Sequence, residues 1–262
     1  MLSFRIATYN IHKFRGIDRR VRPQRIAQVL KQTGADIIAL QEVVGMDETR
    51  ERNHIRAIAE ELGFDFRIGE NRRLKGGAYG NAVLSRLPIV GHRNYDITWP
   101  GKEARGCLQV AVAYDQSERK NTPSILQIYN VHLGTSFFER RYQARRLLAE
   151  DLLGEYAETS PRIVLGDLNE WTRGLASRLL SRHFKTASPR QYFGRAWSYP
   201  GILPFLHVDH IYFDSLLELG KITLHRSRLA LVASDHVPVI ADFRFPKRQC
   251  QPSQVTGQLP GV

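Results

Sequence analysis

Cysteines and long apolar segments are scarce in this sequence of 262 residues. It contains two cysteines, Cys107 and Cys250, which are too few for a disulfide framework and favour a reducing compartment. No run reaches the length of a membrane span, and residues 1–6 lack the basic and apolar regions of a secretory signal. We therefore expect a cytoplasmic protein without structural disulfides.

Several common catalytic motifs are also absent from the sequence. There is no Gly-x-Ser-x-Gly, which argues against acyl transfer through a serine nucleophile. Neither His-Glu-x-x-His nor Cys-x-x-Cys occurs, so a zinc site is disfavoured. The glycine-rich segment 75–80 lacks the Walker spacing and a following helix signal. We interpret this segment as a flexible turn rather than a phosphate loop.

Positive charge is what the sequence has in excess. Its 38 lysines and arginines outnumber 26 acidic residues, giving a formal charge of +12 and a pI of about 10.0. Such a balance favours a polyanionic partner, which could be nucleic acid, an anionic membrane surface or a small phosphorylated substrate. A generally basic surface without any such partner would give the same net charge.

The apolar pattern predicts an α/β fold. Helical spacing predicts helices at 23–34, 55–62, 139–156 and 175–180, and the arginine pairs of the third helix are expected to be solvated. Short apolar or alternating runs predict strands at 4–8, 36–40, 64–68, 81–84, 89–96, 107–114, 124–131, 162–165, 208–213, 222–224 and 239–245. This grouping is typical of two packed sheets covered by helices in one domain, 1–246. Residues 247–262 have the composition of a disordered tail.

The segment 162–171 is the most informative part of the chain. Three apolar residues predict a buried strand, and Gly166 allows a sharp turn after it. Asp167 and Asn169 therefore lie at the carboxyl end of a strand, where open α/β sheets place their sites. Either side chain could instead cap the helix that Trp171 would enter. Taken alone, this segment does not separate the two interpretations.

Other predicted strands end in residues of the same chemical kind. The residues at strand ends and turns are Asn10, Glu42, His132, Asp167, Asn169, Asp209, Asp235 and His236. Their carboxylates and amides suit a hard cation such as Mg²⁺. A histidine held by an aspartate, such as His236 by Asp209 or Asp235, could handle a proton at a phosphoryl oxygen. Each residue alone has an ordinary structural explanation, but five strands ending this way favour one site.

The order of these motifs resembles the endonuclease/exonuclease/phosphatase (DNase I-like) superfamily, and its small bacterial branch in particular. The matching motifs are Tyr9-Asn10-Ile11-His12, Leu40-Gln41-Glu42, Gly80-Asn81-Ala82-Val83-Leu84-Ser85-Arg86, Asn130-Val131-His132-Leu133, Gly166-Asp167-Leu168-Asn169, Val208-Asp209-His210-Ile211 and Ser234-Asp235-His236-Val237-Pro238. They span residues 4–245 in the family's order, which is far more specific than any single motif.

The resemblance implies a four-layer α/β/β/α sandwich of two packed mixed β-sheets, with a metal site where the sheets open. It implies Mg²⁺ as the cofactor, with Mn²⁺ as an alternative. Glu42 matches the principal metal ligand, and Asn10 and Asp235 would contribute directly or through water.

The resemblance also implies roles for the remaining site residues. Asp167 would orient or deprotonate the attacking water, and Asn169 would hold a phosphoryl oxygen. His236, paired with Asp209, would stabilise the charge that builds up on the phosphoryl group, with His132 as a second donor. We expect Asp167 and His236 both to be essential, whichever of them is the general base.

We therefore predict a Mg²⁺-dependent phosphodiesterase that acts through in-line attack of water, and we expect a monomer. Nucleic acid is the favoured substrate, with Asn81 and Arg105 matching phosphate contacts and with Arg72 and Arg73 as further candidates. Phospholipids or inositol phosphates are the alternative, because the aromatic loop 197–206 could contact an anionic membrane or could simply pack in the core. A non-catalytic nucleic-acid-binding module is a third interpretation, which the complete set of site residues disfavours.

Overall fold

The structure, a computed structural model, describes residues 3–45, 53–74, 77–115, 124–155, 160–170, 174–187, 198–199 and 206–245. The predicted tail at 247–262 lies outside these ranges, as does most of the aromatic loop at 197–206. Within the described ranges, no helix is long and apolar enough to cross a bilayer.

Two six-stranded sheets form the centre of the molecule. The first has the order β11 (Glu218–Leu224), β12 (Val239–Arg244), β1 (Ser3–Asn10), β2 (Ile37–Val44), β4 (Gly77–Ser85) and β3 (Asp65–Leu74). The second has the order β5 (Ile89–Asp96), β6 (Gly106–Asp115), β7 (Ser124–His132), β8 (Arg162–Asp167), β10 (Asp209–Phe213) and β9 (Lys185–Ala187). Both sheets are mixed, because β1 pairs with β2 and β7 with β8 in parallel while the other neighbours are antiparallel.

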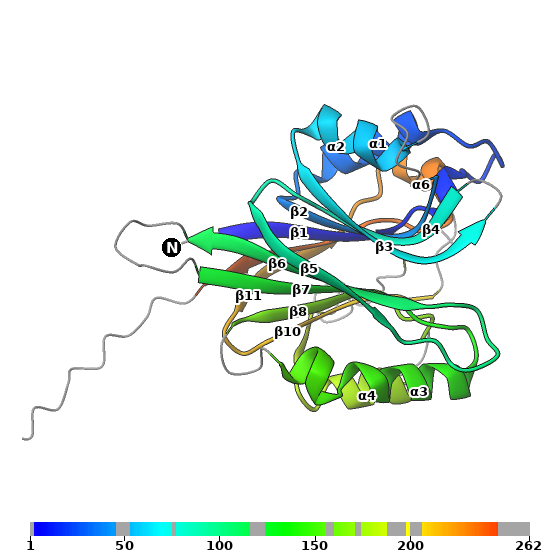
Figure 1. Cartoon of the computed structure of the whole chain (residues 1–262). Helices are drawn as coiled ribbons and strands as arrows, with labels where there is room; N and C mark the ends of the chain where they lie inside the picture. The colour runs from blue at the N-terminus through cyan, green and yellow to red at the C-terminus, as the bar shows by residue number, and fades with distance from the viewer. Residues whose placement is uncertain are drawn as a thin grey trace, which may run out of the picture.

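Helices cover the outer face of each sheet (Figure 1). The first sheet carries α1 (Pro23–Thr33), α2 (His54–Leu62) and α6 (Ala230–Ala233), and the second carries α3 (Phe137–Leu147) and α4 (Leu175–Leu180). The 3₁₀ turn η1 (His12–Phe14) follows β1, and the π-helical turn η2 (Glu150–Gly154) follows α3. The predicted α/β/β/α sandwich is confirmed.

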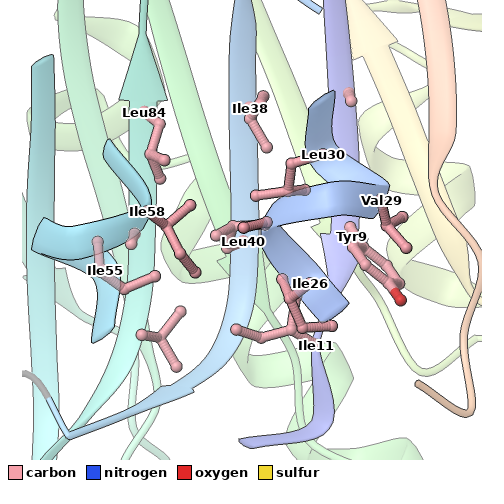
Figure 2. Packing of buried hydrophobic residues seen from close by; sticks show 14 of the residues in the cluster. Tyr9, Ile11, Ile26, Val29, Leu30, Ile38, Leu40, Ile55, Ile58 and Leu84 are labelled. Carbon is pink, nitrogen blue, oxygen red and sulfur yellow. The ribbon is translucent and has the colours of Figure 1, made fainter. Parts of the chain in front are cut away.

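Central strands have apolar side chains on both faces because each sheet lies between two apolar layers. In β2, Ile38 and Leu40 pack with α1 and α2, as Figure 2 shows, whereas Ile37 and Ala39 pack between the sheets. Strand β8 follows the same rule, since Ile163 faces the other sheet and Val164 lies in the cluster under α3 and α4. This two-sided burial explains the nearly continuous apolar runs in the sequence.

Most predicted helix boundaries are confirmed by local geometry. Helix α1 has Pro23 as its first residue, where the missing N–H costs nothing. Gly34 ends α1 at φ 61° and Gly63 ends α2 at φ 68°, and both lie in the left-handed region that glycine adopts without strain.

The helix predicted at 139–156 is wrong as one continuous element. Helix α3 ends at Leu147, Ala149 is extended at ψ 151°, and η2 follows. Leu147 and Leu152 are both fully buried in one cluster. In a continuous helix two residues five positions apart would point about 140° away from each other. The break lets both leucines enter the same core.

Two other local predictions differ from the structure. Gly77–Gly80, predicted as part of a flexible turn, belong to β4, and a Cβ on Gly80 would lie 2.0 Å from the Gly69 carbonyl oxygen. The glycine therefore permits close strand pairing. Arg140, predicted to be solvated, is buried and donates hydrogen bonds to the carbonyls of Gly134 and Thr135. The short strand β9 had no recognisable sequence signal.

A buried ion pair yields a stability prediction. Arg162 Nε and Nη2 donate to Asp214 Oδ2 at 2.8 Å and Oδ1 at 2.9 Å, and both residues are buried. Asp214→Ala would leave the guanidinium buried without its partner, so we expect a loss of about 3–5 kcal/mol in the free energy of unfolding. Urea denaturation would measure it. The exposed pair of Arg146 with Asp151 is the control, and a similar loss in Asp151→Ala would contradict this account.

Candidate active site

The predicted site residues converge where strands of the two sheets end. In the second sheet, Asp167 at the end of β8 is the register partner of both His132 on β7 and Asp209 on β10. Asn10 ends β1 of the first sheet, and its Nδ2 donates to Asp167 Oδ2 at 3.0 Å. These residues therefore form one three-dimensional cluster, although Asp209 begins β10 rather than ending a strand, and Glu42 lies inside β2 at a register shift between Leu40 and Val43.

Asp167 is the centre of this cluster and is only 2% exposed. Its Oδ1 accepts the Asn169 N–H at 2.8 Å, and its Oδ2 lies 3.7 Å from the Nε2 atoms of both His132 and His236. Gly166 precedes it at φ 141°, where a Cβ would lie 1.9 Å from the Val131 carbonyl oxygen. Only glycine lets β8 approach β7 this closely and still deliver the carboxylate.

Neither Asp167 nor Asn169 caps the helix that follows. The Glu170 carboxylate accepts the N–H groups of Ala176 and Ser177 at the start of α4, at 3.2 and 2.7 Å. Asn169 is left-handed at φ 50°, and its side chain donates to the Leu133 carbonyl at 2.8 Å. The capping interpretation is rejected for α4, whereas the start of the helix expected at Trp171 lies outside the described residues. The sequence did not indicate the role of Glu170, because this residue lies six positions before the N–H that donates to it, outside the capping-box spacing.

His236 and Asp209 form the buried pair that the sequence suggested. His236 Nδ1 lies 2.9 Å from Asp209 Oδ2. Burial alone would lower the pKa of His236, but Asp209, together with Asp167 and Asp235, outweighs burial and raises that pKa to about 10. The imidazole is therefore charged at neutral pH, with Nδ1–H donated to Asp209 and Nε2–H on the side of Asp167.

His132 has the opposite protonation state. Arg105 Nη1 lies 2.9 Å from His132 Nδ1, and burial together with this guanidinium lowers the pKa of His132 to about 4. Because a guanidinium can only donate, Nδ1 must accept and the ring proton resides on Nε2, on the side of Asp167. Asp167 thus lies between a charged imidazole and a neutral one. Such opposed pKa shifts are typical of acid–base sites.

Glu42 is held ionised beside Asp167. Its Oε2 accepts Lys13 Nζ at 2.9 Å, and its Oε1 accepts Asn10 Nδ2 at 3.3 Å. Burial raises the pKa of Glu42, but positive charge at His132 and Lys13 and the two hydrogen bonds lower it to about 2. Since His132 is neutral at pH 7, Lys13 and Asn10 maintain the carboxylate there. Glu42 adopts φ 55°, a costly conformation that is common at functional sites.

Asp235 joins the site through its neighbours. Its Oδ1 lies 3.3 Å from His12 Nδ1 and accepts the Ser234 hydroxyl at 3.2 Å, and that hydroxyl also lies 2.8 Å from the Asn10 carbonyl oxygen. Burial raises the pKa of Asp235, but the combined effect of His12 and His236 is larger and opposite, so this pKa is lowered overall. The sequence motif included His12 without assigning it a role and did not extend to Lys13, because a turn of left-handed residues has no periodicity to reveal it.

The donor set fits a hard cation. Glu42 and Asp167 present carboxylate oxygens to the Asn10 amide nitrogen, and Asp235 is linked to the Asn10 carbonyl through the Ser234 hydroxyl. Asp167, Asp209 and His236 also have potential ligand atoms within 4.8 Å of one another. His236, however, is protonated and bonded to Asp209, which makes it a poor metal ligand. The oxygen-rich group with Glu42 is the better cation site.

Asn81 and Arg105 occupy different surroundings. Asn81 is buried and donates to the carbonyls of Gly106 at 3.0 Å and Asn130 at 3.3 Å, so it ties β4 to the second sheet. Arg105 contacts His132 inside the site, and its buried Nε has no hydrogen-bond partner. Arg105 is therefore placed to offer a donor there, whereas the Asn81 donors are already engaged. Their contact with a phosphate stays a prediction.

A buried polar network beneath the site was not predicted. Asn130 donates to the carbonyls of Leu40 and Ala82 at 2.9 Å each and accepts Gln41 Nε2 at 2.7 Å. Gln41 also donates to Thr8 Oγ1 at 3.1 Å. These bonds fix β7 of one sheet against β2 and β4 of the other. The available sequence signal was a polar residue in an apolar strand close to a site residue: Gln41 before Glu42, and Asn130 two residues before His132.

The two histidines should titrate at opposite ends of the pH range. His236, with its raised pKa, contributes stability that is complete below about pH 6.5 and is lost as the pH rises toward 10. His132, with its lowered pKa, costs stability as the pH falls from about 6.5 toward 4. Imidazole NMR across this range would record both titrations. Asp209→Asn should lower the pKa of His236 and leave that of His132 near its original value; matching pKa values for the two rings would contradict the assignment.

The family was identified by comparison with known proteins. The model of the endonuclease/exonuclease/phosphatase family matches residues 7–236. An uncharacterized protein named YbhP from Escherichia coli K12 is 30% identical over 257 residues, which covers 93% of this chain and 97% of that protein. The same identity and coverage are found for its Shigella flexneri counterpart.

Solved structures share the fold at lower identity. A mannosyl-6-phosphatase from Bacteroides thetaiotaomicron superposes with a TM-score of 0.75 at 17% identity, over 92% of this chain and 100% of that one. The catalytic domain of human Nocturnin gives 0.70 at 18%, over 93% and 95%. Truncated TDP2 from Caenorhabditis elegans gives 0.67 at 19%, over 93% and 98%. Because the family model covers residues 7–236, this chain belongs to the endonuclease/exonuclease/phosphatase family.

Proposed function

We propose that this protein is a metal-dependent phosphodiesterase that hydrolyses its substrate through in-line attack of water. It belongs to a family of phosphoesterases, and the finer assignment rests on one observation. A buried carboxylate oxygen, Asp167 Oδ2, lies 3.7 Å from the Nε2 atoms of His132 and His236, whose pKa values are shifted in opposite directions.

Asp167 is the residue that would receive a water molecule. Its Oδ1 is fixed by the Asn169 N–H and its Oδ2 by Asn10, so the carboxylate cannot rotate freely. A carboxylate held in this way can orient a water and accept its proton during attack on phosphorus. Asn169, bonded to Asp167 and Leu133, lies beside it for contact with a phosphoryl oxygen.

His236 would stabilise the developing negative charge. Asp209 holds its Nδ1–H, so the charged ring directs its remaining proton away from Asp209. A preorganised cationic donor in a buried site needs little reorganisation during the reaction, which makes its stabilisation large. His132, whose ring proton resides on Nε2, provides a second donor. Since His236 is already protonated and the Nδ1 of His132 accepts from Arg105, Asp167 is the group to which we assign the water proton.

Glu42, Asn10 and Asp235 would hold the cation, for which we propose Mg²⁺ with Mn²⁺ as a substitute. When bound, such a cation supplies Lewis-acid polarisation of a phosphoryl oxygen and neutralises charge. Glu42 is already ionised, and Lys13 occupies its Oε2 at 2.9 Å. Lys13 therefore has to give way, or share the carboxylate, when the cation binds.

Nucleic acid is the substrate class that we propose first. The formal charge of +12 favours a polyanion, and Arg105 lies within the site. Arg72 is less available, because it is paired with Glu103 and lies over the Tyr79 ring. A phospholipid or inositol phosphate is the second candidate, supported by the exposed aromatic residues of α3. One structural neighbour is a mannosyl-6-phosphatase, so phosphomonoesters belong in the assay.

Turnover of bis-p-nitrophenyl phosphate tests the reaction class. We expect activity with Mg²⁺ or Mn²⁺ that EDTA abolishes and excess metal restores. Asp167→Asn and His236→Gln should each lower kcat at least about 100-fold, because each removes a proton-handling or charge-stabilising group. Asp151→Asn alters an exposed carboxylate that pairs with Arg146 rather than with a site residue, and it should match the wild type.

The same assay can overturn the proposal. Full activity of either site variant would show that the site is assigned to the wrong residues. Absence of EDTA-sensitive turnover on plasmid DNA, abasic DNA, RNA, mixed lipid vesicles and phosphomonoesters would favour a non-catalytic binding module.

A further inference from the structure

Helix α3 has an unusual distribution of side chains. Its exposed positions are Phe137, Phe138, Arg141, Tyr142 and Arg145. Its buried positions are Glu139, Arg140, Gln143, Ala144 and Leu147. Phe138 is 62% exposed and Phe137 is 51% exposed. Three aromatic rings therefore face outward while three polar side chains face the protein, which is unusual for a surface helix.

The exposed residues form one continuous stripe. At 3.6 residues per turn, the five exposed positions fall within an arc of about 140°. Glu139 is the single acidic residue of α3, and it is buried. The outward stripe thus consists of aromatic and arginine side chains alone.

Trp99 extends this stripe from a second element. It lies in the loop between β5 and β6, which reaches toward the start of α3 (Figure 1). The Trp99 ring centroid is 6.5 Å from that of Phe138 and 5.9 Å from that of Tyr142, and Phe137 lies 5.5 Å from Phe138. We call Trp99, Phe137, Phe138 and Tyr142 the aromatic patch.

The buried polar residues lock the helix in this orientation. Gln143 Oε1 accepts the Gly134 N–H at 2.8 Å, and its Nε2 donates to Glu139 at 3.3 Å. Arg140 donates to the carbonyls of Gly134 and Thr135. Rotating α3 to bury its phenylalanines would break these hydrogen bonds and leave the polar groups without partners. The exposure of the aromatic patch is therefore fixed by the fold.

The aromatic patch lies beside the catalytic cluster. Helix α3 begins at Phe137, in the segment that leads directly from His132 at the end of β7. Trp99 precedes Arg105 in one loop, and Arg105 Nη1 lies 2.9 Å from His132 Nδ1. A surface that touches the patch would therefore lie next to the candidate site.

We propose that the aromatic patch, with Arg141 and Arg145, docks this protein onto an anionic lipid surface. Phenylalanine offers no hydrogen bond, so two exposed phenylalanines favour an acyl environment, while tryptophan and tyrosine suit the headgroup boundary. The two arginines and the net charge of +12 complement anionic headgroups. The patch lies on the outward face of an outer helix, which suits a flat bilayer better than a strand of nucleic acid. The docking goes beyond the proposed function and holds whichever phosphate ester is cleaved.

Co-sedimentation of the full chain with vesicles tests the docking. We expect binding to phosphatidylcholine vesicles that contain about one third phosphatidylglycerol, and weaker binding to phosphatidylcholine alone. The double variant Phe137→Ser/Phe138→Ser should lose at least about 10-fold in partitioning. Arg141→Gln/Arg145→Gln should weaken binding to the anionic vesicles and reduce its salt dependence. Leu216→Ser removes a comparably exposed apolar side chain, at 49%, and should bind as the wild type does.

Three outcomes would overturn the docking proposal. The wild type could stay in the supernatant, or the phenylalanine variant could bind vesicles as tightly as the wild type. The phenylalanine variant could also lose binding to a single-stranded oligonucleotide while keeping vesicle binding, which would make the patch a base-stacking surface. Thermal melting confirms that each variant is folded. Turnover of bis-p-nitrophenyl phosphate should be unchanged in these variants, so a failure of the catalytic proposal would be visible separately.

Discussion

The hydrogen bond between the Asn10 amide and the Asp167 carboxylate joins the two sheets, and the candidate site depends on it. The two residues lie 157 positions apart in the chain, and their atoms are 3.0 Å apart in space. Such a bond requires a fixed distance between the sheets, which the apolar layer between them and the Asn130 network provide. Asn10 also donates to Glu42, so this one amide fixes the Glu42 carboxylate, our proposed cation ligand, relative to the Asp167 carboxylate, to which we assign the water.

Burying several carboxylates together is costly, and the surrounding charges show how the fold offsets that cost. Lys13 is paired with Glu42, and His236 is paired with Asp209. Arg105 contacts His132 rather than an acid of the central cluster. Its positive charge, together with burial, keeps His132 neutral. The two imidazoles beside Asp167 therefore differ in charge because their other ring nitrogens face partners of opposite sign.

The sequence predicted much of the fold and of the site because both follow local rules. Pro23, Gly34 and Gly63 mark helix ends through backbone geometry, and Asp167 meets Asp209 because β8 ends where the antiparallel β10 begins. The rest depends on contacts between distant elements. The break after α3 is set by which leucines reach the core, and the cap supplied by Glu170 has no fixed sequence spacing. Neither is encoded by periodicity.

The central claim is that residues from separate strands act as one catalytic unit, and a double-mutant cycle tests it most directly. Steady-state kcat/KM would be measured for the wild type, Asp167→Asn, His236→Gln and the double variant. Residues that act on the same step are strongly non-additive. We therefore expect the double variant to lose about as much as the worse single variant. Losses that multiply would contradict the account, because they would show that the two residues act independently.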